Sequence, residues 1–244
     1  MRILGICSYN GTNYQGWAKQ PNKDTIQGMI ESCLSSFFNR EITIQGAGRT
    51  DAGVHAIGQR FHFDVDVDEI DLDRLIYSLN MMLPPDISIE DMIEVEEDFH
   101  ARFSAVEKVY GYSILLKSKD VMFYQLMYTC PYELDVDMLK ETLTHFIGEH
   151  NFNNFTSKPQ DKDNFVRNIF DIKVEDIQET ISITFRGNGF MRYMIRYIVG
   201  CAIEVARGKM TLEEVDALLD ENSERNVVSC KAPACGLVLI DVKY

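Results

Sequence analysis

Positive charge is scarce in this sequence. Lys and Arg together number 24 against 38 Asp and Glu in 244 residues, so the formal net charge is -14 at pH 7 and the pI is about 4.8. A strongly acidic total argues by itself against a nucleic-acid partner, because phosphates are repelled. However, Arg186, Arg192 and Arg196 lie within one short segment, and Arg167 precedes it. Since only the local field meets an anionic partner, the composition still allows a basic cleft inside an acidic shell.

Long apolar runs and cysteine pairs are missing as well. The longest apolar segment, residues 190–206, contains Arg192, Arg196 and Glu204, so it is not expected to span a membrane. The apolar run at the start of the chain is too short for a signal peptide. The six cysteines form no C-x-x-C pair and the histidines do not complete a zinc site, so we expect reduced, mostly buried thiols and no metal. These absences together predict a cytoplasmic protein.

What remains is the composition of a globular protein, with 45% hydrophobic and 25% charged residues. Its length fits one large domain or two of ordinary size, and it is sufficient for a sizeable core. The first half predicts strands and helices in the order β-α-β-β-α-β. The strands are expected at residues 2–9, 41–46, 59–65 and 87–95, and the helices at residues 26–37, capped by Asp24 or Thr25, and 72–79, ended before Pro84.

The second half repeats that order. Strands are expected at residues 109–116, 168–174, 180–185 and 237–242, and helices after Asp135, across 190–206 and from a capping box of Thr211 with Glu214. The pattern predicts an α+β fold of two ferredoxin-like, RRM-like halves whose antiparallel sheets join around a central cleft. We expect an N-terminal domain of residues 1–105 and a C-terminal domain of residues 106–244, with residues 100–108 along the bottom of the cleft.

The most distinctive stretch is the ten residues Gly46–His55, with the sequence Gly-Ala-Gly-Arg-Thr-Asp-Ala-Gly-Val-His, which follow a predicted strand. This stretch places one carboxylate, Asp51, in a tight loop with small residues on both sides and Arg49 two positions before it. Small residues remove the bulk that normally shields a backbone, so a large partner could approach the carboxylate closely. The alternative is a glycine-rich surface turn capped by an aspartate.

Three further parts of the chain stand out by their motifs. They are His100–Ala105 with Lys108–Tyr112, Arg186–Gly200, and Ala232–Leu239. Together with Tyr9–Trp17, Ile26–Gly28 and the Asp51 loop, they make the chain resemble the pseudouridine synthases, and among these the ones that act on tRNA. The resemblance runs nearly end to end, and ordered motifs at compatible spacing are far more specific than any short pattern.

The resemblance implies an isomerase that acts on uridine in the anticodon stem-loop of tRNA. The bond from the ribose to N1 breaks, the uracil turns, and it is rejoined through C5, so no net redox change occurs and no metal or organic cofactor is implied. Family members act as homodimers whose RNA cleft spans both subunits. A second subunit lets a short chain bind a long tRNA. No membrane partner is implied.

Three side chains match the family's catalytic positions. Asp51 matches the catalytic aspartate, which acts as nucleophile or base, and Arg196 matches the arginine that pairs with it, since a nearby cation favours the ionised carboxylate. Tyr110 matches the tyrosine whose ring stacks on the target uracil and whose hydroxyl could assist a proton transfer. Without the family match, Arg196 is an ordinary helix residue that extends its charge to solvent. Tyr110 is then a core tyrosine, as we expect Tyr112 and Tyr77 to be.

Other residues are candidates for binding the RNA. Arg49 matches an arginine that the family places beside the flipped base, where a flat cation could fill the vacated space; a phosphate contact or a loop salt bridge is the alternative. Gly236 and Leu237 would shape the pocket under the base, although strand packing explains both equally well. Candidate phosphate contacts, each of which could also be an ordinary surface charge, are Lys19, Lys108, Arg167, Arg186 and Arg192.

Two other kinds of function compete with a tRNA isomerase. One is a paralogue that modifies another RNA, or an RNA-binding protein without catalysis; the complete set of Asp51, Tyr110 and Arg196 argues against the loss of catalysis. The other is a carboxylate-dependent hydrolase, but such enzymes usually need two acidic residues beside the bond, and only Asp51 lies in a suitable loop. We also expect His55 to pack in the loop with a hydrogen bond to the backbone, and Trp17 to pack near the first strand.

Overall fold

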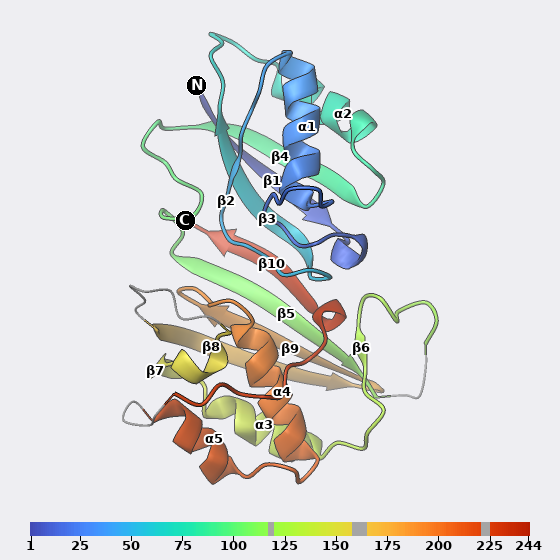
Figure 1. Ribbon diagram of the computed structural model, residues 1–244, viewed down its shortest axis with the longest axis vertical. Helices are drawn as coiled ribbons and strands as arrows, with labels where there is room; N and C mark the ends of the chain where they lie inside the picture. Colours follow the sequence, from blue (N-terminus) through green and yellow to red (C-terminus); the bar gives the residue numbers. More distant parts are fainter. Residues whose placement is uncertain (117–119, 158–164, 221–224) are drawn as a thin grey trace. The chain divides into compact units, whose positions relative to one another are not determined.

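The computed structural model of the protein describes residues 1–116, 120–157, 165–220 and 225–244, which form two compact units (Figure 1). Unit 1 comprises Met1–Val106 and Val238–Tyr244, and unit 2 comprises Glu107–Leu237. The sequence pattern predicts a C-terminal domain that continues to residue 244. In the structure the end of the chain belongs to unit 1 instead, because β10 (Leu237–Lys243) pairs in parallel with β3 (His55–Asp64).

Unit 1 is built on a mostly antiparallel sheet. Its strands lie in the order β4 (Ile87–Val95), β1 (Arg2–Tyr9), β3 and β10, and the short β2 (Gln45–Gly46) also pairs with β3. A 3-10 turn, η1 (Gly11–Asn13), follows β1. Helix α1 (Ile26–Phe38) contacts α2 (Leu72–Met82), and α2 packs on β4 (Figure 1).

Helix α1 begins where the sequence places a capping residue. Thr25 is its N-cap, and the Thr25 hydroxyl accepts a hydrogen bond from the backbone N–H of Gly28. The apolar side chains Ile26, Ile30 and Leu34 share one face of the helix, and all three are fully buried. The capping residue and the apolar periodicity therefore predict both the start of α1 and its buried face.

The core of unit 1 is rich in aromatic rings. Phe61 and Phe63 are buried on β3, and their rings stack with centroids 6.2 Å apart. The Trp17 ring is 2% exposed, and its centroid lies 6.0 Å from that of Tyr9 on β1 and 6.4 Å from that of Phe61. The expectation that Trp17 packs near the first strand is confirmed.

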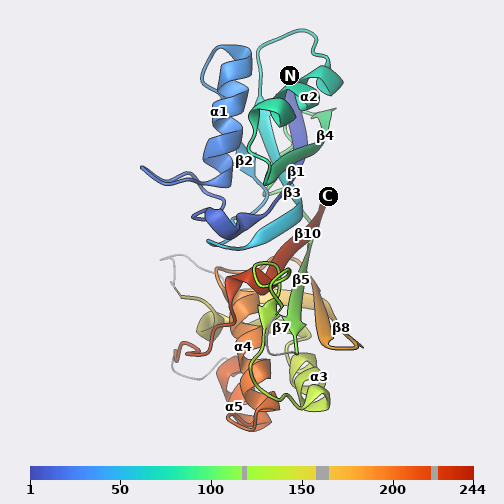
Figure 2. The ribbon, with the colours of Figure 1, turned by 90° about the vertical axis from the view of Figure 1, so that its right-hand side faces the viewer.

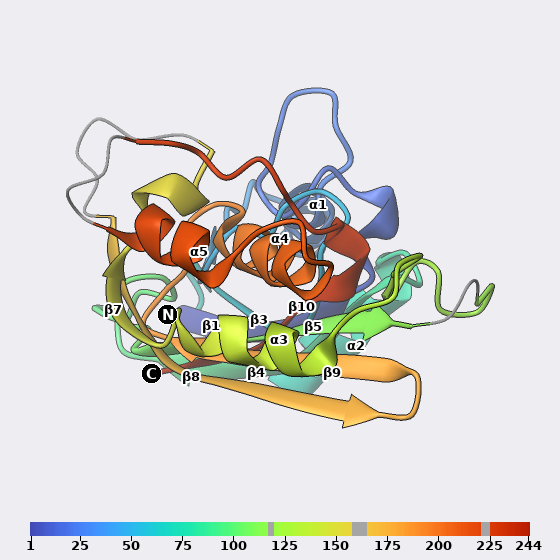
Figure 3. The same cartoon turned by 90° about the horizontal axis from the view of Figure 1, so that it is seen from below.

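The strands of unit 2 are mostly antiparallel as well. They lie in the order β5 (Glu107–Leu115), β9 (Thr180–Gly187), β8 (Val166–Ile177) and β7 (Gly148–Asn151), and β6 (Tyr128–Thr129) pairs in parallel with β5. Strands β8 and β9 form a long hairpin, which Figure 3 shows along its length. Helix α4 (Met194–Ala206) packs beside α3 (Val136–Thr144), and α5 (Leu212–Leu219) follows α4 (Figure 2). The 3-10 turns are η2 (Asn153–Phe155) and η3 (Ala234–Gly236).

Helix α4 is buried around its whole circumference. All of its residues except Glu204 are buried, including the cationic Arg196 at 9% exposure. Helix α5 begins with the predicted capping box, in which Thr211 accepts a hydrogen bond from Glu214 N and the Glu214 carboxylate accepts one from Thr211 N. The prediction of this helix start is confirmed.

Several predicted element boundaries differ from the structure. The strand expected over residues 41–46 is reduced to β2, and the strand expected from residue 59 begins at His55. The helix expected from residue 190 begins only at Met194, because Tyr193 before it has a left-handed backbone with φ 67°. Tyr77, expected in the core, is 69% exposed, so that prediction is wrong.

The predicted class, α+β with mostly antiparallel strands, is confirmed. Both units combine such a sheet with helices. Within the described ranges, no helix is long and apolar enough to cross a membrane.

Candidate active site

Asp51 lies in the loop between β2 and β3, and the backbone on both sides of it is held within unit 1. The Trp17 N–H donates to the carbonyl oxygen of Thr50 at 3.1 Å, and the Val54 N–H donates to the carbonyl oxygen of Asp51 at 3.1 Å. Gly16 has φ +88°, and a Cβ on it would come within 2.6 Å of the Thr50 carbonyl oxygen, so the segment before α1 passes as close as glycine allows. The loop is therefore a turn whose backbone is fixed next to Asp51.

The small residues of this loop have two different environments. Ala47 is fully buried, so its small size serves packing within unit 1. Ala52 is exposed, and Gly48, Asp51 and Gly53 are partly exposed. The close approach of a large partner that the sequence suggests is therefore limited to the tip of the loop, around Asp51.

Arg49 and His55 flank Asp51 with opposite surroundings. Arg49 is exposed, and no other residue in the described part of the chain forms an ion pair or side-chain hydrogen bond with its guanidinium. His55 is 6% exposed, and its Nδ1 accepts a hydrogen bond from the backbone N–H of Gly11 at 3.1 Å. The expectation that His55 packs in the loop and bonds to the backbone is confirmed.

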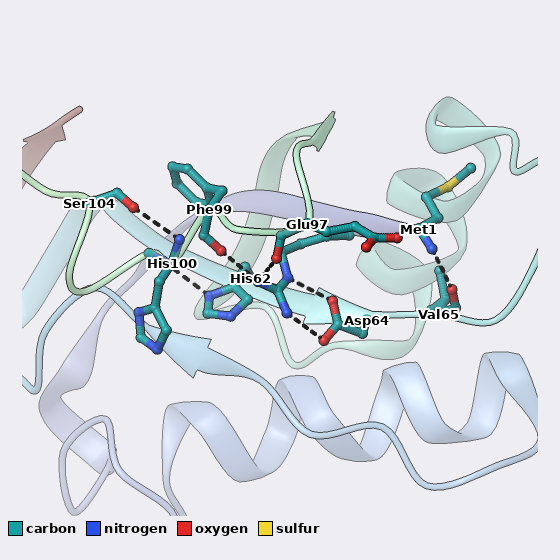
Figure 4. Close-up of polar contacts among 10 residues, drawn as sticks. Met1, His62, Asp64, Val65, Glu97, Phe99, His100 and Ser104 are labelled. Carbon is teal, nitrogen blue, oxygen red and sulfur yellow. Dashed lines mark hydrogen bonds and ion pairs between the residues drawn. The ribbon is translucent and has the colours of Figure 1, made fainter.

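A buried histidine on β3 holds the segment His100–Ser104 (Figure 4). His62 is 4% exposed, its Nδ1 accepts a hydrogen bond from Ala101 N at 3.1 Å, and its ring centroid lies 4.7 Å from that of His100. Burial, followed by the charges of His100 and Arg2, lowers the pKa of His62 to about 4. The ring is therefore neutral at pH 7, which leaves Nδ1 able to accept this hydrogen bond.

Tyr110, the first of the predicted catalytic residues in unit 2, lies on β5. It is 8% exposed and lies opposite Phe185 of β9 in the strand register. Its ring meets that of Phe190 edge-to-face, with 5.4 Å between centroids. Phe190 belongs to the same sequence motif as Arg196, so two of the predicted motifs meet in unit 2 at this ring pair.

Arg196 lies in the first turn of α4, where it is tied to the chain before η3. Its Nε donates to the carbonyl oxygen of Ala232 at 2.8 Å, and the Ala232 N–H donates to the carbonyl oxygen of Arg196 at 2.9 Å. At 9% exposure this guanidinium does not extend into solvent, which was the alternative interpretation. The structure thus gives a buried cation whose side chain and backbone are both fixed.

Three cationic groups surround the Tyr193 ring at the start of α4. Arg192 Cζ lies 4.7 Å from the ring centroid, Arg196 Cζ lies 5.4 Å from it, and Lys231 Nζ lies 4.2 Å from it. Arg192 also donates to the Tyr193 hydroxyl at 2.9 Å. Among the described residues, no carboxylate pairs with the exposed Lys231 ammonium. This Tyr193 cluster concentrates positive charge in a chain that is acidic as a whole.

The other predicted phosphate contacts include cations that already have protein partners. Arg186 binds Glu107 through Nε and Nη2, both at 2.9 Å, and this pairing raises the pKa of Arg186. Lys19 pairs with the buried carboxylate of Glu31 at 2.8 Å. Arg167 donates to the carbonyl oxygen of the preceding residue at 2.6 Å. No local sequence pattern indicates the partners that Arg186 and Lys19 have.

Gly236 and Leu237, at the junction of η3 and β10, are both buried beside a tyrosine. The Tyr112 ring is the nearest side chain to Gly236, and its hydroxyl donates to the carbonyl oxygen of Pro233 at 2.9 Å. Burial raises the pKa of Tyr112 well above its ordinary value, so this hydroxyl remains a donor. Lys108, on the same strand as Tyr112, is partly exposed.

The predicted site residues are divided between the two units. Asp51 and Arg49 belong to unit 1, and unit 2 holds Lys108, Tyr110, Arg167, Arg186, Arg192, Arg196, Gly236 and Leu237. Two residues of the Tyr193 cluster were not predicted. The signal for Tyr193 was its position beside Arg192 inside a named motif, whereas no local pattern indicates that Lys231 returns to the same ring. In the described ranges, no three His, Cys, Asp or Glu side chains are grouped so that they could hold a metal ion.

Comparisons with known proteins agree on one protein family. The family described as tRNA pseudouridine synthase matches residues 6–104 and 143–244. A "tRNA pseudouridine synthase A" of Caldicellulosiruptor saccharolyticus is 38% identical over 243 residues, which cover 99% of this chain and 99% of that protein. The protein of the same name from Mycoplasma genitalium is 38% identical over 244 residues, 100% of this chain and 98% of that protein. A chain of the solved Cbf5-Nop10-Gar1 complex aligns with 82% of this chain, which spans 54% of that chain, at 12% identity and a TM-score of 0.34.

Proposed function

This chain belongs to the tRNA pseudouridine synthase family, and from that premise we infer that it is an isomerase which converts uridine to pseudouridine in tRNA. In this reaction the bond between the ribose and N1 of uracil breaks and a bond between the ribose and C5 forms. C5 loses a proton and N1 gains one, so the product is an isomer of the substrate. The observation that carries the assignment to a site is the partly exposed Asp51 in a backbone-held turn.

We propose that Asp51 is the catalytic residue. An ionised carboxylate can act as a nucleophile or as a base on the ribose, and both roles require a charged group in a fixed place. The backbone contacts on both sides of Asp51 supply the fixed place, and its partial exposure leaves the carboxylate accessible. Arg49, exposed two positions before it, is proposed to fill the space that the flipped base leaves.

We assign Arg196 the role of keeping the Asp51 carboxylate ionised, and Tyr110 the role of stacking on the target uracil. A buried cation with a fixed guanidinium favours the charged form of a carboxylate. Arg196 meets this requirement through its bond to Ala232. The Tyr110 ring is packed by Phe190, so it can stack on a base with little further loss of side-chain freedom. Gly236 and Leu237 are proposed to shape the base pocket.

RNA phosphates are proposed to bind the Tyr193 cluster. Its exposed cations, Arg192 and Lys231, lie at one ring, and a phosphate would offset the repulsion between them. Lys108 and Arg167 are further candidates for phosphate contacts. Arg186 is a weaker candidate than the sequence suggests, because Glu107 already neutralises its charge.

The position of the modified uridines, the location of the enzyme, its cleft and its oligomeric state are proposed from the family resemblance. We place the modified uridines in the anticodon stem-loop, the enzyme in the cytoplasm, and the catalytic cleft between two ferredoxin-like halves. We also propose a homodimer whose RNA-binding surface uses both subunits. The dimer is supported by exposed apolar side chains in one loop of unit 2, among them Val121, Met122 and Tyr124 at 66%, 77% and 59% exposure.

Replacement of Asp51 tests the proposed reaction directly. Asp51→Asn keeps the shape of the side chain and removes its charge, so we expect the isomerisation rate to fall by about 10⁴-fold or more while tRNA affinity stays within about twofold. The measurement is tritium release from tRNA labelled at C5 of uridine, together with a tRNA binding titration. Asp68→Asn is the matched control, because Asp68 is an exposed aspartate elsewhere in unit 1.

The outcomes separate the competing functions. An Asp51→Asn protein that retains the parental rate would show that another group performs the catalysis. Tight tRNA binding by the parental protein without tritium release would instead indicate a non-catalytic RNA-binding protein. Pseudouridine mapping in cells that lack the protein identifies the substrate: loss confined to the anticodon arm of tRNA supports the proposal, and loss only in ribosomal RNA indicates a paralogue.

A further inference from the structure

We propose that Tyr9, Thr50 and Gln59 are positioning residues, which hold the turn of Asp51 in its reactive orientation through a buried hydrogen-bond network. None of the three would touch the reacting atoms. The inference rests on the proposed function, because it assigns these side chains a role only through the Asp51 carboxylate. It adds to that function by naming the buried side chains that fix the backbone of the Asp51 loop.

The network joins two strands to two points of the loop. The Tyr9 hydroxyl at the end of β1 lies 2.8 Å from the Thr50 hydroxyl oxygen. The Gln59 side chain on β3 donates through Nε2 to the carbonyl oxygen of Gly48 at 3.0 Å and to the Tyr9 hydroxyl at 3.4 Å. Gln59 Oε1 accepts from the backbone N–H of Arg60 at 3.1 Å, so both ends of this amide are engaged.

Thr50 is the point at which the network reaches Asp51. Its hydroxyl is bonded to Tyr9, and its carbonyl oxygen is bonded to the Trp17 N–H at 3.1 Å. The residue directly before Asp51 is thus held by its side chain and by its backbone, from two different segments of unit 1. The backbone directly before the Asp51 carboxylate is therefore fixed.

Burial makes it costly in free energy to break any hydrogen bond of this network. Tyr9 is 5% exposed, Thr50 is 7% exposed and Gln59 is fully buried. A buried polar group that loses its partner keeps the full penalty of desolvation, so each bond strongly disfavours a displaced loop. The surrounding core is aromatic and apolar, with Trp17 and Phe61 close by, and polar groups in such a core specify one arrangement where apolar packing alone would tolerate several.

The dependence of the reaction rate on the position of the catalytic group explains why such a network is useful. A nucleophile or base must stay close to its ideal position, and a shift of about 1 Å costs about 100-fold in rate. An exposed loop tip with small residues would not by itself keep the carboxylate that close to its ideal position. The buried hydroxyls and the amide provide the support that the loop sequence itself lacks.

The test compares isosteric deletions of single hydroxyls. Thr50→Val and Tyr9→Phe each remove one side of the same hydrogen bond, and we expect each to lower the single-turnover rate by about 10- to 100-fold with tRNA affinity within about twofold of the parent. Thr50→Ser keeps the hydroxyl and should restore most of the rate. The double variant should be no slower than the slower single variant, because both changes break the Tyr9–Thr50 bond and only Tyr9→Phe also breaks the bond from Gln59.

Tyr244→Phe is the matched control. It deletes a tyrosine hydroxyl that donates to the carbonyl oxygen of Ala101 at 2.9 Å in the same unit, away from the Asp51 loop. We expect it to leave the single-turnover rate at the parental level, and thermal denaturation of both variants shows whether a loss of rate exceeds what a loss of stability explains. A purely structural role for Tyr9 would give the two variants equal rates.

The result that overturns the proposal is a parental single-turnover rate in both Thr50→Val and Tyr9→Phe. Additive rate losses in the double variant would also overturn it, since the two hydroxyls would then act independently. These failures are distinct from failure of the proposed function. The function fails when the parental protein releases no tritium from any tRNA, whereas the positioning inference fails in variants of an active parent.

Discussion

At the scale of the residue, one substitution of Tyr110 separates the contribution of its ring to the reaction rate from that of its hydroxyl. Tyr110→Phe keeps the edge-to-face contact with Phe190 and removes only the hydroxyl. We expect this change to cost about 10-fold in the single-turnover rate, much less than Asp51→Asn, because the ring still stacks on the uracil.

The measurement for Tyr110 is tritium release at saturating tRNA. Tyr112→Phe is the companion variant: it removes a hydroxyl on the same strand that donates to Pro233, and it tests whether any buried hydroxyl of β5 has the same effect. A Tyr110→Phe protein as slow as Asp51→Asn would assign the hydroxyl, not the ring, the larger role.

Single residues show how far periodicity alone can predict position. Tyr112 and Tyr77 were both expected in the core, and only Tyr112 is buried. On a helix, Tyr77 lies two positions from both Leu75 and Leu79, which is a rotation of about 200°. The buried leucines therefore place Tyr77 on the opposite, exposed side of α2. This error was avoidable from the sequence, whereas the approach of Lys231 to Tyr193 depends on tertiary structure that no local pattern encodes.

At the scale of the element, α4 is closely covered by the chain near Cys230. A Cβ on Gly200 would lie 2.3 Å from the carbonyl oxygen of Cys230, and the two hydrogen bonds between Arg196 and Ala232 prevent that backbone from moving away. Gly200→Ala should therefore lower the free energy of unfolding by about 1–3 kcal/mol through overpacking, even though alanine favours a helix by about 1 kcal/mol.

Chemical denaturation with urea measures the effect of Gly200→Ala. Gly28→Ala in α1 is the matched control, because there the nearest atom to an added Cβ is the Thr25 side-chain oxygen at 3.0 Å, not a backbone carbonyl. Both variants replace a helical glycine by alanine, so both gain helix propensity. If Gly200→Ala were no less stable than Gly28→Ala, the close approach would not determine the packing of α4.

Elements were predictable where a local signal marked their ends. The Thr25 cap and the Thr211–Glu214 box predicted the starts of α1 and α5, and both are confirmed. The start of α4 was predicted four residues early, because the apolar run continues through residues that the left-handed Tyr193 separates from the helix. The short β2 likewise shows that β propensity alone does not create a strand, because only Gln45 and Gly46 of the predicted segment pair with β3.

At the scale of the whole molecule, one buried histidine makes stability depend on pH. The pKa of His62 is lowered to about 4 by burial and by the nearby His100 and Arg2, against about 6.5 in an unfolded chain. Above about pH 6.5 both states are neutral, and the contribution to stability is complete. As the pH falls from 6.5 to 4, the unfolded state binds a proton that the folded state does not, so stability is lost over this window.

His62→Asn tests this pH dependence. Its side-chain oxygen can still accept from Ala101 N, but it cannot be protonated, so we expect the loss of unfolding free energy between pH 7 and pH 5 to become smaller than in the parent. Urea midpoints at the two pH values measure it. His150→Asn in unit 2 is the control, and an equal loss in His62→Asn and the parent would contradict the assigned role of His62.

The family and the broad class were predictable for the molecule as a whole. The ordered motifs predict the tRNA pseudouridine synthase family, and the comparisons confirm it. The Asp51 loop could be named from its sequence, but its support by Tyr9, Trp17 and Gln59 comes from residues outside the loop, and Tyr9 and Trp17 lie more than 30 residues before Asp51. Alternating patterns predict that β10 is a strand without stating which unit it joins, and in the structure it pairs with β3 of unit 1.

The placement of β10 has a consequence for the order in which a ribosome delivers this protein. The strand that pairs with His55 and Ala56 follows the rest of unit 2 in the chain, so it is synthesised after that unit. A nascent chain therefore carries β3 with this pairing unmade while the whole of unit 2 emerges, and an unsatisfied strand edge is a template for unwanted association. Unit 1 has parts before and after unit 2 in the chain, so synthesis that stops within unit 2 would leave the unit that holds Asp51 without β10.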